Sequence, residues 1–149
     1  MRKLILSIAL SILAASGALA ASPEQEKAFV DSYKTAFEAQ DADALAALFF
    51  TEGAIPEAVD FYKMAMTADF GKKISEIALQ DLTPEEVAEA AATMDTPDGG
   101  KAILKPQPYK KLVIKIDTSD ASGTSSTTNT IFVAEEDGKL GVAMPAPAN

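Results

Sequence analysis

The chain of 149 residues is 48% hydrophobic and 23% charged, and it contains no cysteine, histidine or tryptophan. It therefore lacks the residues of common zinc sites, of haem ligation and of Ser-His-Asp or Cys-His catalysis. Its 13 basic residues are outnumbered by 22 acidic ones, for a formal net charge of −9, and such a charge repels nucleic-acid phosphates. We expect one acidic domain without metal, cofactor or nucleic-acid partner.

The first twenty residues have the pattern of an export signal. Arg2 and Lys3 precede an apolar stretch over residues 4–15, and the sequence Gly-Ala-Leu-Ala then supplies a small-x-small cleavage pattern. The apolar stretch is shorter than the roughly 20 residues that span a bilayer. We predict a signal peptide cleaved between Ala20 and Ala21, and a mature chain that is periplasmic or secreted, with no membrane segment.

Two helices are predicted at the start of the mature chain. Residues 22–25 form a capping box with proline at the first helical position, and an apolar stripe at helical spacing follows over 29–37. Asp41 or Asp43 caps a second, short helix that carries the apolar residues of 45–49. The two helices are expected to form a hairpin.

The middle of the chain alternates between helix and strand. Pro56 opens a third helix, which Gly71 closes. Residues 74–82 are rich in β-formers and predict a strand. A second capping box at 83–86 then starts a helix that is expected to run to about Met94, before a turn cluster.

The last third changes to the period of a strand. Apolar residues alternate with polar ones over 112–116, which is typical of a half-buried strand. A polar loop is predicted over 119–126 and a second strand over 127–134. The acidic turn at 135–138 then leads into a last strand over 140–144.

Helices first and an antiparallel meander last predict an α+β domain, with N-terminal helices packed on a curved antiparallel sheet. We divide the chain into a cleaved signal peptide over 1–20, one α+β domain over 21–144, and a flexible tail over 145–149.

Residues 29–49 resemble the first two helices of the nuclear transport factor 2-like superfamily, which has a cystatin-like fold. In that superfamily an aromatic helix, a short acidic break and a helix ending in Leu-Phe follow one another. The resemblance implies a cone-shaped domain that encloses a pocket and is often dimeric through its outer sheet face. The strand that usually follows Leu-Phe is missing or reduced here, because residues 50–55 lead straight to Pro56.

The ketosteroid isomerases of that superfamily suggest catalytic candidates. The resemblance places Tyr33 at the tyrosine that stabilises the enolate and Glu57 at the proton-shuttling carboxylate, with Asp60 as a further candidate acid. Asp117 and Asn129, which are candidates for a second oxyanion donor, alternate to the outer sheet face. Glu57 also fits a helix start, and Tyr33 fits a core position. No catalytic residue is therefore assigned, and the balance is against an enzyme.

We expect instead an exported, non-catalytic domain that binds a small apolar molecule in an internal pocket. The side chains expected to line the pocket are Phe29, Tyr33, Phe37, Phe61, Tyr62, Met66 and Phe132. One alternative is a structural or interaction protein with a filled core, which forms a homodimer through an exposed apolar sheet face bearing Val113, Ile131 or Val133. A ketosteroid-isomerase-like or dehydratase-like enzyme is the third hypothesis.

Overall fold

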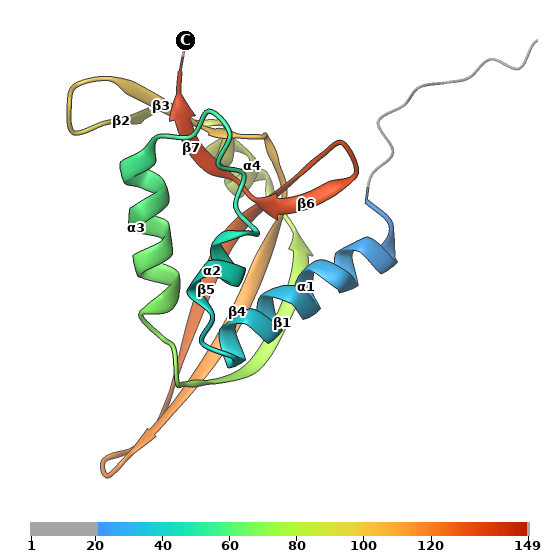
Figure 1. The fold of residues 1–149 in the computed structure, drawn as a ribbon, viewed down its shortest axis with the longest axis vertical. Coiled ribbons are helices and arrows are strands. Elements are labelled where there is room, and N and C mark those ends of the chain that lie inside the picture. Colours follow the sequence, from blue (N-terminus) through green and yellow to red (C-terminus); the bar gives the residue numbers. More distant parts are fainter. Residues whose placement is uncertain (1–20, 149) are drawn as a thin grey trace, which may run out of the picture.

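The computed structural model describes residues 21–148, so the predicted signal peptide and its cleavage site lie outside or at the border of the described residues. The predicted α+β fold with helices first is confirmed (Figure 1). Within this range, no helix is long and apolar enough to cross a membrane. The helices are α1 (Pro23–Glu38), α2 (Ala42–Ala46), α3 (Pro56–Thr67) and α4 (Pro84–Ala91).

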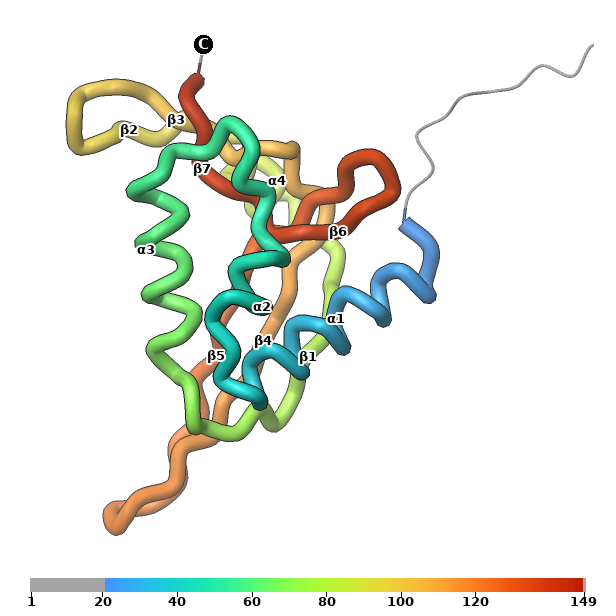
Figure 2. Tube along the Cα trace, in the orientation of Figure 1, coloured from blue at the N-terminus to red at the C-terminus, as the bar shows by residue number. Residues whose placement is uncertain are grey.

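The strands form two antiparallel sheets. The larger sheet has the order β1-β4-β5-β6, and the smaller one has the order β2-β3-β7. The trace in Figure 2 shows α1 and α2 on one side of the larger sheet and α3 beside them. The strands are β1 (Lys73–Asp81), β2 (Met94–Asp95), β3 (Lys101–Lys105), β4 (Pro108–Asp120), β5 (Gly123–Glu136), β6 (Lys139–Val142) and β7 (Met144–Pro147).

The helix starts follow the predicted caps. Ser22 and Thr83 each form a capping box, and the Asp41 carboxylate accepts a hydrogen bond from a backbone N–H of α2. The predicted helix ends were too late. Helix α3 ends at Thr67, and Gly71, with a φ of +85°, lies in the turn before β1 instead of closing the helix. Glycine suits this turn because it adopts positive φ without strain.

The core lies between α1 and the inner face of the larger sheet. The alternation predicted for β4 is confirmed, because Leu112, Ile114 and Ile116 are all at most 2% exposed. The buried side chains of this core are Phe29, Tyr33, Ala36, Phe37, Leu45, Phe49, Met66, Ile74, Leu112, Ile114, Ile116, Val133, Leu140, Val142 and Met144.

The three residues predicted for an apolar dimer face do not share a face. Val133 is fully buried in the core, and Ile131 pairs with the buried Leu112 and so faces inward as well. Only Val113 lies on the outer face, where its cross-strand partner is Thr130. Directly paired residues of antiparallel strands point to the same side of a sheet, so this register corrects the expectation.

The short segment after α2 forms a single β-bridge and no full strand. Phe49 forms a single parallel bridge with Val142 of β6. The Val142 N–H donates to the Leu48 carbonyl at 2.8 Å, and the Phe50 N–H donates to the Val142 carbonyl at 3.0 Å. A Cβ atom on Gly141 would lie only 2.8 Å from the Leu48 carbonyl oxygen, so this close approach requires glycine.

The predicted polar loop over 119–126 is instead the end of a long hairpin. Strand β4 continues to Asp120 and β5 begins at Gly123, so the hairpin projects beyond the rest of the fold (Figure 1). Strand pairing rests on backbone hydrogen bonds, and threonine favours strands, so a polar sequence with little to bury still pairs here. The hydroxyls of Ser119 and Thr124 lie 3.1 Å apart across it.

The predicted flexible tail is also corrected. Residues Met144–Pro147 form β7, which pairs with β3, a strand that was not predicted from the sequence. Ala146 is only 2% exposed. The prolines at 145 and 147 misled the prediction, because β7 is an edge strand and edge strands tolerate proline.

The buried position of Ala146 gives a test of this correction. We expect Ala146→Asp to lower the free energy of unfolding by about 2–3 kcal/mol, because it buries a charge without a partner. The matched substitution Ala121→Asp, in the exposed hairpin turn, is expected to change it by less than about 0.5 kcal/mol. Urea unfolding followed by circular dichroism measures both. Equal effects of the two substitutions would indicate a flexible tail after all.

Candidate functional site

A pocket of about 450 Å³ lies between α1, α3 and the β4–β5 hairpin. This volume is within the range of small-molecule sites. Five of the seven residues predicted for a pocket line it. The full lining is Tyr33, Phe37, Phe61, Tyr62, Ala65, Met66, Asp69, Ile116, Thr128, Asn129, Thr130 and Ile131.

The other two predicted lining residues lie elsewhere. Phe29 is buried one helical turn before Tyr33, in the main core. Phe132 packs in a small separate cluster with Phe50 and Leu104. The reason is the alternation of β5: because Ile131 and Val133 face the core, Phe132 between them faces the opposite side of the sheet.

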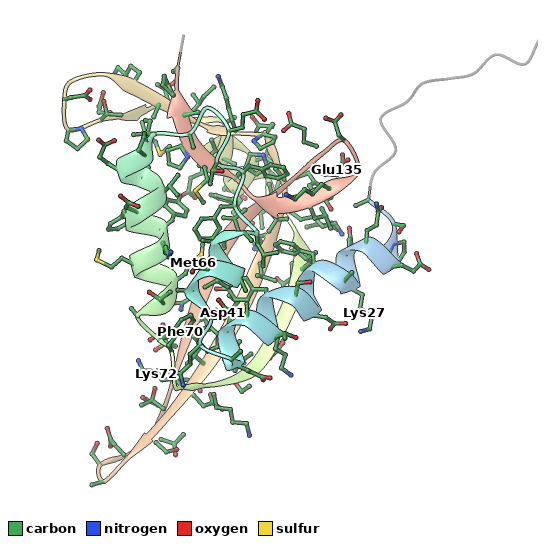
Figure 3. All side chains as sticks on the ribbon, viewed as in Figure 1. Lys27, Asp41, Met66, Phe70, Lys72 and Glu135 are labelled. Carbon is green, nitrogen blue, oxygen red and sulfur yellow. The ribbon has the colours of Figure 1, made fainter. Side chains whose placement is uncertain are left out.

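Helices α1 and α3 supply the aromatic walls. Phe61 and Tyr62 of α3 meet edge to face, with ring centroids 6.4 Å apart. Phe70, just after α3, meets Phe37 of α1 in the same manner at 5.5 Å. Figure 3 shows Met66 on the side of α3 that faces α2 and the sheet. The Phe37–Phe70 contact joins α1 to the segment that follows α3, whereas the Phe61–Tyr62 contact lies within α3 itself.

The Tyr33 hydroxyl is the polar group of α1 at the pocket. The residue is only 2% exposed. Its hydroxyl forms no hydrogen bond with a residue of the range 21–148, and no buried side-chain oxygen or nitrogen in that range lacks a partner, so this oxygen keeps a small exposure toward the pocket. Burial raises the pKa of the phenol strongly, and the negative charge of Asp69 raises it further. The phenol is therefore protonated at neutral pH, and its O–H is free to interact with a molecule in the pocket.

Asp69 supplies a negative charge at the wall of the pocket. Its carboxylate accepts hydrogen bonds from the Lys72 ammonium at 2.7 Å and from the Asn129 side-chain amide at 3.2 Å. Both bonds favour the ionised form and lower the pKa of Asp69, with Lys72 having the larger effect. Figure 3 shows Lys72 in the turn between α3 and β1. Asp69 thus stays charged at neutral pH.

Sequence reasoning missed Asp69, and it placed Asn129 on the wrong face. Asp69 lies in a turn between a helix and a strand, where no periodicity indicates the direction of a side chain. Asn129 pairs directly with the buried Ile114, so it points inward. Asp117 does lie on the outer face as expected, and it accepts a hydrogen bond from the Ser126 hydroxyl.

The two acids proposed for proton transfer are not part of the pocket. Glu57 and Asp60 are exposed on the first turns of α3 and do not line it. In the described part of the chain, moreover, no three acidic side chains gather as the ligands of a metal ion would. Asp69 is thus the carboxylate that the fold brings to the pocket with Tyr33.

The chain matches no family model and no curated protein. Among solved structures, it matches a protein of unknown function from Mycobacterium tuberculosis at 16% identity and a TM-score of 0.38, over 85% of this chain and 70% of the other. It also matches Aln2 from a Streptomyces species at 15% identity and a TM-score of 0.38, over 84% of this chain and 90% of the other. At such scores the similarity carries no argument about function.

The unpaired hydroxyl of Tyr33 leads to a prediction about stability. We expect Tyr33→Phe to change the free energy of unfolding by less than about 0.5 kcal/mol, because the hydroxyl has no protein hydrogen bond to lose and stays open to the pocket. Tyr109→Phe is the matched control. It removes a hydrogen bond from the Tyr109 hydroxyl to Glu26 and should lower the same quantity by about 1 kcal/mol.

Urea denaturation of both variants beside the wild type checks this contrast. If Tyr33→Phe is the more destabilising of the two, the Tyr33 hydroxyl has a partner within the protein and is not available to a ligand.

Proposed function

We propose that this chain is an exported, non-catalytic domain that binds a small, mainly apolar molecule in the pocket between α1, α3 and the β4–β5 hairpin. One observation carries the proposal: an open cleft of about 450 Å³ is lined by aromatic, methionine and isoleucine side chains, with the Tyr33 hydroxyl and the polar side chains of Asp69, Thr128, Asn129 and Thr130 at its wall. Binding pockets commonly combine such an apolar lining with a few polar groups that orient the ligand.

The rim of the pocket supports a binding role. Phe61 lines the pocket and is nevertheless 59% exposed. Covering exposed aromatic surface is favourable by about 25 cal/mol per Å². A molecule that enters the pocket and contacts Phe61 therefore gains apolar contact that the unliganded protein lacks.

The state of Asp69 supports a non-catalytic role. A general base works best when its pKa is near the working pH. Lys72 and Asn129 lower the pKa of Asp69 instead, which makes the carboxylate a weak base at neutral pH. Glu57 and Asp60 lie outside the pocket, so they do not supply an acid beside Tyr33.

Export rests on the sequence pattern of residues 1–20 and on nothing in the fold. Amino-terminal sequencing of protein recovered from outside the cytoplasm tests it. We expect the recovered chain to begin at Ala21, and a chain that still begins at Met1 would contradict the proposal.

Filling the pocket tests the binding role. We expect the wild type to bind the neutral apolar dye Nile red with one site per chain. Ala65 lines the pocket, so Ala65→Trp should reduce the affinity at least about tenfold, because the indole occupies the space that the dye needs. Fluorescence titration measures both affinities.

Met64→Trp is the matched control for this experiment. Met64 is the neighbouring residue on α3, is 63% exposed and does not line the pocket. The same indole at position 64 should leave dye binding unchanged, and circular dichroism verifies that both variants are folded. Equal dye binding by the two variants would place the site elsewhere on the protein.

A further inference from the structure

We propose that the pocket selects a positively charged amine with an apolar body over neutral or anionic molecules of the same size. This inference rests on the proposed binding function and specifies its ligand class. The ammonium group would lie between Asp69 and the Tyr33 hydroxyl, and the apolar body would contact the aromatic walls. The argument depends on the charge of the pocket, on the free hydroxyl and on the aromatic lining.

The pocket wall is negative. Of the lining residues, all of which lie in the described range, Asp69 is the one that carries a charge. Its side chain is 23% exposed, and its partner Lys72 is not a lining residue and is 42% exposed. Lys72 therefore neutralises Asp69 in part, from the solvent side, where water screens its charge.

The charge of Asp69 acts inside the pocket. Asp69 and Tyr33 line the same pocket, and the carboxylate contributes, after burial, to the raised pKa of the phenol. A carboxylate ligand in the same position would be repelled in the same way, and an ammonium group would be attracted. The net charge of the whole chain has the same sign and further favours the approach of cations.

The Tyr33 hydroxyl offers the second polar contact. It belongs to a residue that is only 2% exposed and that lines the pocket, and it has no hydrogen-bond partner among residues 21–148, so the oxygen keeps its small exposure toward the pocket. Its oxygen accepts a hydrogen bond, and an ammonium N–H donates one. A primary or secondary amine thus contacts the Tyr33 hydroxyl and the Asp69 carboxylate with the same group.

The aromatic walls suit both parts of such a ligand. Tyr33, Phe37, Phe61 and Tyr62 line one pocket. Aromatic rings contribute apolar contact to the body of the ligand, and their faces also attract cations. A neutral alcohol gains only the apolar contact. An anion gains the apolar contact but is not attracted by the ring faces.

Three probes of equal chain length separate charge from apolar contact: octylamine, 1-octanol and octanoate, titrated by calorimetry at neutral pH. Because Lys72 compensates part of the charge, we expect octylamine to bind about tenfold more tightly than 1-octanol, with octanoate the weakest. If 1-octanol or octanoate binds as tightly as octylamine, the inference is wrong while the proposed pocket stands. If none of the three binds, both fail.

Variants then locate the effect. Asp69→Asn should reduce octylamine affinity about tenfold and leave 1-octanol binding unchanged, whereas Lys72→Gln should tighten octylamine binding. Asp137→Asn is the matched control: it removes the same charge at a turn position with a φ of 52°, which asparagine tolerates, away from the pocket lining. Equal losses in Asp69→Asn and Asp137→Asn would show unspecific attraction to an acidic protein and overturn the inference.

Discussion

The pairing of β4 with β5 is the constraint on which the other elements depend. Its register runs from Pro108 opposite Ala134 to Asp120 opposite Gly123. This register decides which residues of β5 face the core, because a shift of one position would move every side chain to the other face. It places Ile131 and Asn129 beside the helices, and β1 and β6 then pair with the two free edges. Both the core and the pocket are consequences of this alignment.

Local patterns predicted the parts of the fold that local physics determines. The capping boxes at Ser22 and Thr83 and the alternation over 112–116 were read correctly, because each is encoded within a few neighbouring residues. The tail was misread because β7 forms only by pairing with a distant strand. The loop over 119–126 was misread because its polar residues lack the alternation that indicates a strand. Strand β7 depends on β3, about forty residues earlier in the chain.

The pocket was predictable in its apolar half. Tyr33, Phe37, Phe61, Tyr62 and Met66 lie on helices, where spacing reveals a shared face. Its polar half depends on a turn residue, Asp69, that meets a strand residue sixty positions later. No local pattern in the sequence indicates this hydrogen bond between Asp69 and Asn129. The position of the single pocket charge is therefore a property of the tertiary fold.

The contacts between residues 48–55 and residues 142–145 bear on how the chain folds. Backbone hydrogen bonds connect Phe50 with Val142 and Ile55 with Pro145, so the segment that links α2 to α3 is anchored by residues about ninety positions further on. Pairings over such distances slow folding, because a long loop must close before they form. The packing of α1 to α3 is therefore complete only when β6 and β7 are in place, which couples the two ends of the domain in folding.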